Sequence, residues 1–173
     1  GDPELLPIKG KQIIDSADVI ILTSPVYVYH CTGSMKAWLD HYGYRWMLHR
    51  PNPDMFSKQG VCISTAAGDG TKWTNKDMAD SMFFWGMGKI YRYGTAVHAI
   101  NYKSISPEKM AEIEKATDKL AEKIRKNYGH VKPVLKTKTY FEVMRKLVKS
   151  GWNEVDVAYW KEHGWTEKAR PWR

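Results

Sequence analysis

Residues 17–27 read Ala-Asp-Val-Ile-Ile-Leu-Thr-Ser-Pro-Val-Tyr, and this stretch decides the fold. Its centre, Val19 to Leu22, is an unbroken apolar run with three β-branched residues in four. Such a run is typical of a strand that is buried on both faces, as in a parallel sheet. Ser24-Pro25 then ends the strand, because proline lacks the backbone N–H of a ladder and disfavours helix at the residue before it.

A loop and a helix are expected after this strand. Ser34 is a candidate N-cap, and the apolar residues that follow it share one helical face, so we expect a helix from Ser34 to Trp46. Strand, loop and helix in this order form half of a βαβ unit. In open α/β sheets, ligands bind at the carboxyl ends of the strands, where Ser24 to Tyr27 would lie.

A second strand and helix follow the first pair. Residues 60–65, Gly-Val-Cys-Ile-Ser-Thr, favour a strand, and residues 66–71 form a loop of small residues. Thr74 or Asn75 is the expected cap of the next helix.

The pattern then repeats a third time. A third strand is expected within residues 92–100, and Ser106-Pro107 marks the start of a long helix that Gly129 ends. Strands that alternate with helices in this way predict an α/β fold.

The composition is that of an ordinary globular protein. The chain has 173 residues, of which 43% are hydrophobic and 27% charged. No apolar run approaches the roughly 18 residues of a membrane span, and the first residues are polar and acidic, unlike a signal peptide. We therefore expect a cytoplasmic protein.

The net charge of +8 is concentrated in the last part of the chain. Residues 129–173 carry ten Lys and Arg against five Asp and Glu. A basic surface of this kind can bind an anionic partner such as a phosphorylated cofactor or a nucleic acid. Because the basic residues alternate with apolar ones at helical spacing, a solvated helical face is the favoured interpretation. Nucleic-acid binding is the weaker one, since no recognised DNA- or RNA-binding motif accompanies the charge.

Two short motifs carry a resemblance to a known family. Ser24-Pro25-Val26-Tyr27, followed by residues 33–40, Gly-Ser-Met-Lys-Ala-Trp-Leu-Asp, resembles the NAD(P)H-dependent FMN reductases and related flavodoxin-like flavoproteins. The resemblance implies a flavodoxin-like three-layer α/β/α fold with a parallel sheet. It also implies an FMN-binding oxidoreductase that takes electrons from NADH or NADPH and reduces a flavin, a quinone, a nitro compound or a protein partner. In such an enzyme the flavin carries the redox chemistry.

The resemblance also assigns residues to the flavin site. Two loops would contact the ring, namely Ser24, Pro25, Val26 and Tyr27, and then Ser64, Thr65, Ala66, Ala67, Gly68, Asp69 and Gly70. Asp69 departs from the glycine-rich family pattern, and an acid beside the pyrimidine ring would oppose the anionic reduced flavin. We find no catalytic constellation and no metal-ligand spacing among the six histidines, so no catalytic or metal-binding residue is assigned.

The resemblance covers only part of the family's domain. The three expected strands correspond to the third, fourth and fifth of the flavodoxin-like order 2-1-3-4-5, so the first two strands and the phosphate loop have no counterpart in the chain. Residues 19–22 would then form a strand edge that is unpaired within this chain. Either residues that precede Gly1 or another chain would cover it. The alternative function is a flavin-free structural or interaction fragment that has lost the phosphate loop.

The last part of the chain has its own signature. We expect residues 1–128 to form the partial flavodoxin-like domain and residues 129–173 a helical extension rich in aromatic residues. This extension could pack on its own domain, clamp the partner in a homodimer or roof a ligand. Packing on the domain or on a dimer partner is favoured. A homodimer or a higher homo-oligomer is expected, since the dimer is the commonest closed assembly.

The two cysteines are too few for a disulfide framework or a metal cluster. Cys31 lies beside His30 in the flavin-side loop. A reactive thiol or a metal ligand at Cys31 is therefore an alternative, but a single Cys–His pair is weak evidence for it. Cys62, within an apolar strand, is expected in the core.

Overall fold

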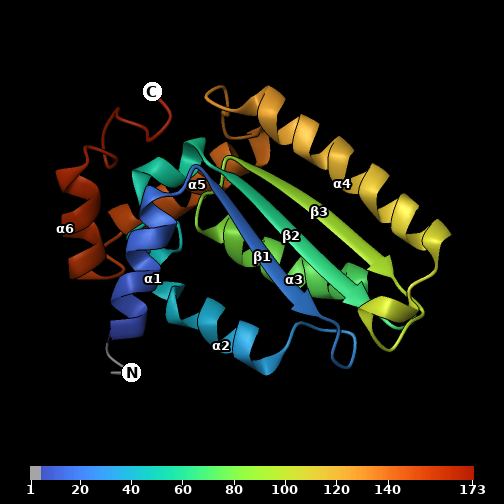
Figure 1. Cartoon of the computed structure of the whole chain (residues 1–173). Helices are drawn as coiled ribbons and strands as arrows, with labels where there is room; N and C mark the ends of the chain where they lie inside the picture. Colours follow the sequence, from blue (N-terminus) through green and yellow to red (C-terminus); the bar gives the residue numbers. More distant parts are fainter. Residues whose placement is uncertain (1–4) are drawn as a thin grey trace.

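The structure is a computed structural model that describes residues 5–173 of the chain, with the side chains of residues 10–173 (Figure 1). The helices and strands occur in the following order: α1 Leu5–Ser16, β1 Val19–Pro25, α2 Gly33–His41, β2 Gln59–Ala66, α3 Thr71–Phe84, β3 Lys89–Ala96, α4 Pro107–Asn127, α5 Leu135–Lys149 and α6 Glu154–Glu162. Three short 3-10 turns, η1 Gly43–Arg45, η2 Pro53–Ser57 and η3 Tyr102–Ser104, lie in the connections. The predicted alternation of strands and helices is confirmed.

The three strands form one parallel sheet in the order β1-β2-β3. Val19 is paired with Gln59, and Gln59 with Lys89, so the strands start level with one another. β2 is hydrogen-bonded on both sides and is almost wholly buried. The parallel sheet of a flavodoxin-like α/β fold is therefore as the sequence predicted.

One expectation for β1 is wrong. Ile20 and Leu22 are buried, but Ile21, between them, is 55% exposed. The strand is thus buried on one face only, because the helices α2 and α3 cover that face and little covers the other. Within the described residues, β1 is also an edge strand with no neighbour beyond it.

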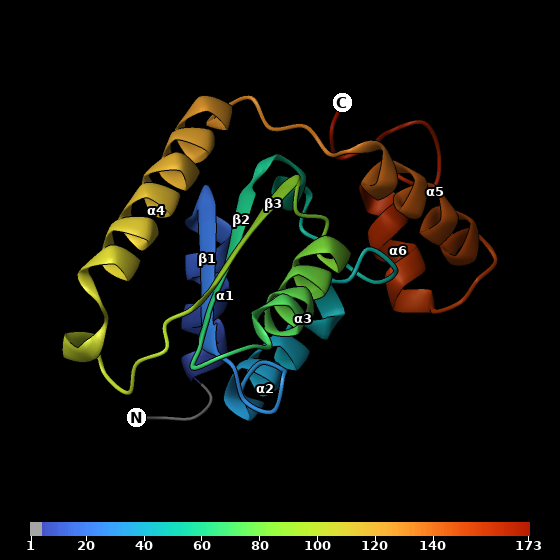
Figure 2. The same cartoon turned by 90° about the vertical axis from the view of Figure 1, so that its right-hand side faces the viewer.

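The layers are unequal in their packing (Figure 2). The face towards α2 and α3 holds a core that includes Met78, Met82 and Trp85. On the opposite face lies α4, whose apolar residues, Met110, Ile113, Leu120 and Ile124, are only half-buried. None of the residues of α4 is buried. Among the described residues, no helix has both the length and the apolar character that a membrane crossing requires.

The helix starts test the predicted caps. The Ser106 hydroxyl accepts the Lys109 N–H (3.2 Å) at the start of α4, as predicted. At α2 the cap is Thr32, whose hydroxyl accepts the Met35 N–H (3.1 Å), so the prediction of Ser34 is wrong.

Other predicted boundaries are also corrected. α2 ends at His41, before the expected Trp46, where the chain tightens into η1. α3 begins at Thr71, so neither Thr74 nor Asn75 is its cap; both are buried in its first turn. β3 begins at Lys89, three residues before the expected start, because its register with β2 extends the ladder there.

The C-terminal helices pack near the amino ends of the strands. Phe141 of α5 stacks on Trp160 of α6 (4.7 Å between ring centroids) and meets Phe56 edge-on (5.7 Å). Phe56 closely precedes β2, so this aromatic cluster lies away from the strand arrowheads (Figure 1). The extension therefore does not roof the carboxyl ends of the strands in this structure.

Polar contacts fasten α6 to the loop before β2. The buried Asp156 carboxylate pairs with His49 Nδ1 (2.8 Å) and more loosely with Arg50 Nε (3.4 Å). The Trp160 indole N–H donates to the His49 carbonyl (2.7 Å), and the Tyr159 hydroxyl donates to the Pro51 carbonyl (2.7 Å).

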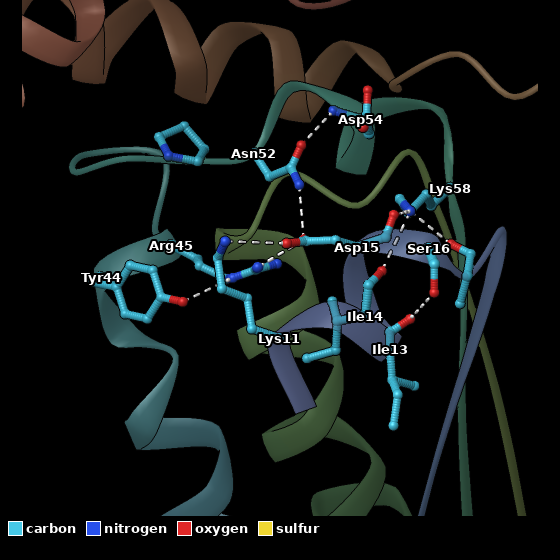
Figure 3. A network of polar contacts seen from close by, with 12 residues as sticks. Lys11, Ile13, Ile14, Asp15, Ser16, Tyr44, Arg45, Asn52, Asp54 and Lys58 are labelled. Carbon is cyan, nitrogen blue, oxygen red and sulfur yellow. Dashed lines mark hydrogen bonds and ion pairs between the residues drawn. The ribbon is translucent and has the colours of Figure 1, made fainter. Parts of the chain in front are cut away.

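A second polar network fastens α1 to the same loop (Figure 3). The Asp15 carboxylate accepts hydrogen bonds from Arg45 Nη2 (2.7 Å) and Asn52 Nδ2 (2.8 Å). Lys58 Nζ donates to the carbonyls of Ile14, Asp15 and Ala17 at the end of α1. Arg45 is only 2% exposed, so its charge depends on Asp15 for compensation.

Replacing Asp15 tests the importance of this network. Burial acts to raise the pKa of Asp15, but the hydrogen bonds from Arg45 and Asn52 and the charges of Arg45 and Lys11 together lower it below 3.8. The stabilisation is therefore present above that pH and is lost as the pH falls through the lowered pKa. We expect Asp15→Ala to reduce the free energy of unfolding by about 3 kcal/mol at pH 7, because Arg45 remains buried without its partner.

Urea denaturation at pH 7 and at pH 3 measures this effect. The difference between wild type and Asp15→Ala is expected to shrink at the lower pH. Asp80→Ala is the matched control, because it removes a carboxylate from an exposed pair with Lys76, and a change of less than about 0.5 kcal/mol is expected there. Equal effects of the two substitutions would contradict the prediction.

Candidate functional site

The two predicted loops meet at the carboxyl ends of β1 and β2. The ladder pairs Ser24 with Ser64 and Pro25 with Thr65. Beyond the ladder, the Val26 N–H donates to the Thr65 carbonyl (3.0 Å). The parallel register therefore brings together two segments that are far apart in the sequence.

The two serines of these loops are structural. Ser24 is buried; its hydroxyl donates to the Pro25 carbonyl (2.9 Å) and accepts the Thr32 N–H (3.1 Å). Ser64 is also buried, and its hydroxyl donates to the Thr71 carbonyl (3.2 Å). Each serine thus uses its hydroxyl to close its own loop.

The first loop continues into a strained two-residue turn. Tyr27 and His30 exchange both backbone hydrogen bonds, each 3.0 Å long. The two residues between them, Val28 (φ 49°) and Tyr29 (φ 67°), have left-handed backbone conformations. This is the type I′ hairpin turn, for which Asn-Gly is the favoured sequence. Non-glycine residues in this region cost about 1–3 kcal/mol each, and such strain clusters at functional sites.

The tip of this turn is exposed. Val28 is 91% exposed, and Tyr27 and Tyr29 are each more than half exposed. Burial of these side chains therefore does not compensate for the strained backbone. The turn was not predicted from the sequence, because Val28-Tyr29 carries none of the glycine or asparagine signals of its type.

The second loop presents a row of backbone donors. Ala67, Gly68 and Asp69 are exposed, and their amides donate to no acceptor within the part of the chain that the structure describes. Asp69 turns one carboxylate oxygen back onto the Gly70 N–H (2.7 Å). The Ala67 carbonyl accepts the His98 N–H (3.2 Å), which ties the loop to the segment after β3.

Gly70 connects the second loop to the strained turn. It has φ 101° and forms the N-cap of α3. A Cβ at this position would lie 2.5 Å from Val26 Cγ1 and 3.1 Å from Tyr29 Cα. Only glycine accommodates both the backbone conformation and this close approach.

The environments of both cysteines favour the protonated thiol, which is the less reactive form. Burial and the neighbouring Asp77 carboxylate raise the pKa of the Cys31 thiol, which favours its protonated form. Cys62 lies in the core, as predicted, and burial raises its pKa to about 12. Over residues 5–173, no group of three or more His, Cys, Asp or Glu is placed to hold a metal ion.

The sequence match decides the family. Residues 8–101, more than half of the chain, match the family described as NADPH-dependent FMN reductase. The chain belongs to the NADPH-dependent FMN reductase family. The match runs from α1 through β3 and so includes both loops at the carboxyl ends of the strands.

Two solved structures show limited similarity. One is a thermophilic tryptophan halogenase from Streptomycin violaceusniger, with 15% identity and a TM-score of 0.47 over 63% of this chain and 72% of that chain. The other is the general stress protein 14 of Treponema denticola in complex with FMN, with 11% identity and a TM-score of 0.47 over 69% of this chain and 72% of that chain. No curated protein matches the sequence significantly.

Membership in the NADPH-dependent FMN reductase family confirms what the sequence motifs implied. The chain is an FMN-binding, NAD(P)H-dependent oxidoreductase, and the flavin-free alternative is not favoured. The backbone donors of the second loop suit the chemistry of the cofactor's ring edge. The ring edge of a flavin carries carbonyl and nitrogen acceptors, and the unpartnered amides of residues 67–69 are donors.

Replacing Val28 tests the strain in the turn. Asparagine tolerates the left-handed region better than valine does. Because the Val28 side chain is exposed, its replacement sacrifices little buried apolar surface. We expect Val28→Asn to raise the free energy of unfolding by about 1 kcal/mol in urea denaturation. The same exchange at exposed Val155, in helix α6, is the control and is expected to give no increase. A loss of stability in Val28→Asn would contradict the strained turn.

Proposed function

We propose that the two loops hold the isoalloxazine ring of FMN and that the enzyme reduces an acceptor with electrons from NADPH. The observation that carries this proposal is the meeting of the two loops at the carboxyl ends of β1 and β2, where one loop exposes Tyr27 and the other exposes three amides, of residues 67–69, that donate to no acceptor in the described chain. The two loops meet at two points, namely the Val26–Thr65 hydrogen bond and the close packing of Gly70 against Tyr29.

The residues of the proposed site have different roles. Pro25 and Val26 would contact the ring from the first loop, and Tyr27 would offer its own ring for stacking or edge contact with the flavin. Thr65, Ala66 and Ala67 continue β2 towards the second loop, where the amides of residues 67–69 would donate to the ring edge. Ser24, Ser64 and Gly70 shape the loops from behind.

Bound FMN would supply the redox chemistry, accepting a hydride from the nicotinamide and passing electrons on. The protein would orient the ring and set its electrostatic surroundings. The carboxylate of Asp69 stands next to the free amides and already accepts the Gly70 N–H. A negative charge there would disfavour the anionic reduced flavin and so lower its reduction potential.

An absorbance scan across the flavin bands tests the proposal. Purified protein is mixed with excess FMN, and separately with excess riboflavin, and then desalted. We expect flavin bands to survive desalting with FMN, and their intensity with riboflavin reports how much of the affinity comes from the ring alone. In the FMN-loaded protein, NADPH is expected to bleach the bands under anaerobic conditions.

Substitution of Gly68 focuses this experiment on the loop. A Cβ added at Gly68 would have no neighbour within 4 Å, so Gly68→Pro removes one of the three amide donors without a clash from that atom. We expect at least a tenfold loss of affinity for FMN and for riboflavin alike. Gly33→Ala, at the start of α2 and also with open space around it, serves as the control and is expected to bind both flavins as wild type does. Wild-type protein that retains no FMN would overturn the proposal.

We also propose that the enzyme is a cytoplasmic homodimer that is joined along the open edge of β1. The two free thiols suit a reducing compartment. The exposed Ile13 and Ile21 flank an apolar groove along β1, and an unpaired apolar edge of this kind favours association.

Light scattering coupled to size-exclusion chromatography tests the dimer. We expect twice the mass of the 20.0 kDa chain for wild type and a monomer for Ile21→Lys, because a lysine on an edge strand opposes pairing with another strand. Val143→Lys, on the exposed side of α5, is the control and is expected to stay dimeric. A monomeric wild type would overturn this proposal.

A further inference from the structure

The strained turn lies along the first two turns of α3. Gly70, at the start of the helix, approaches Tyr29, and Asp77, seven residues later, reaches the residues that follow the turn. Positions seven apart in a helix share one face and are about 10 Å apart along the axis. The helix therefore contacts the loop at two separate points.

One carboxylate oxygen of Asp77 makes both contacts at the second point. Asp77 Oδ2 lies 3.0 Å from His30 Nδ1 and accepts the Cys31 N–H at 3.1 Å. His30 closes the turn through its paired backbone hydrogen bonds with Tyr27, and Cys31 is the next residue. The Asp77 side chain is 26% exposed and the His30 side chain 65% exposed, so water competes less for the Cys31 N–H bond than for the contact with His30.

The turn needs an external support. Its two central residues are in the left-handed region, and their side chains are exposed, so neither backbone preference nor core packing at the tip favours the observed conformation. Strained backbone of this kind persists only where the surrounding structure over-determines it. Asp77 provides such a constraint at the base of the turn.

We infer that Asp77 is a positioning residue that holds the turn at residues 27–30 in the conformation that presents Tyr27 to the flavin ring. The inference rests on the proposed function, because it takes this turn as a wall of the ring site. Asp77 touches His30 and Cys31, and its proposed effect on the ring acts through them. His30 contributes an ion pair when it is protonated and a neutral hydrogen bond in the suitable tautomer otherwise.

The first test needs no flavin. Chymotrypsin cleaves after exposed aromatic residues, and its rate reports how often the local backbone opens. We expect Asp77→Ala to speed cleavage after Tyr27 and Tyr29 at least tenfold. Labelling of Cys62 with a neutral disulfide reagent reports global unfolding, because this thiol is fully buried, and its rate is expected to stay unchanged.

Two further variants sharpen this test. Asp80→Ala removes the next carboxylate of α3, which pairs with Lys76 across one turn, so cleavage at the loop is expected to stay at the wild-type rate. Asp77→Asn keeps an oxygen that can accept the Cys31 N–H but loses the charge that pairs with His30, so an intermediate rate is expected. If labelling of Cys62 shows that Asp77→Ala unfolds globally, the cleavage rate of Asp77→Asn is used to test the inference instead. An unchanged cleavage rate in that variant overturns the inference.

The second test uses FMN and riboflavin as probes. A turn that positions the ring should affect both ligands equally, because only FMN carries the phosphate. We expect Asp77→Ala to weaken both by at least tenfold, with partial recovery in Asp77→Asn and an altered visible circular dichroism of the bound flavin. If wild type and Asp77→Ala bind FMN equally well, the inference fails and the proposed function stands. If wild type binds no flavin, the proposed function fails, while the cleavage experiment still decides whether Asp77 holds the turn.

Discussion

The parallel pairing of β2 with both of its neighbours is the constraint on which the rest of the structure depends. It sets the three strands level, so their carboxyl ends come to one edge and the loops after β1 and β2 lie against each other. β2 is thereby hydrogen-bonded along both edges, and the loop that follows it leads through the N-cap Gly70 into α3. The contacts of the proposed site depend on this register. They include the Val26–Thr65 hydrogen bond and the hydrogen bond from the Cys31 N–H to Asp77.

Much of this arrangement could be predicted from the sequence, because it rests on signals that span several residues. The apolar run before Ser24-Pro25 and the Ser106-Pro107 cap identified β1 and α4, and the alternation of elements gave the fold class. The family motifs pointed to FMN, and the family match confirms that expectation. Helix starts were less predictable, because several polar residues lie near each start. Thr32 caps α2 although Ser34 was the expected cap, and a left-handed glycine, not Thr74 or Asn75, precedes α3.

The features that the sequence could not reveal depend on long-range contacts. Val28-Tyr29 lacks the composition of a type I′ turn, and its conformation is set by Gly70 and Asp77, which are distant in the sequence. The hydrogen bonds of the Ser24 and Ser64 hydroxyls to backbone groups of their own loops could likewise not be read from the sequence. The assignment of the loop residues to the flavin ring stays a prediction.

The uneven covering of the sheet has a consequence for motion. α4 is a 21-residue helix with a well-formed cap, yet none of its residues is buried, whereas β2 and α3 hold the main core. Segments with few buried apolar contacts open at a lower free energy than the whole domain. The native ensemble should therefore include conformers in which α4 has left the sheet and the strands keep their order. The sheet and α3, which carry the candidate site, would then stay folded while α4 detaches and reattaches.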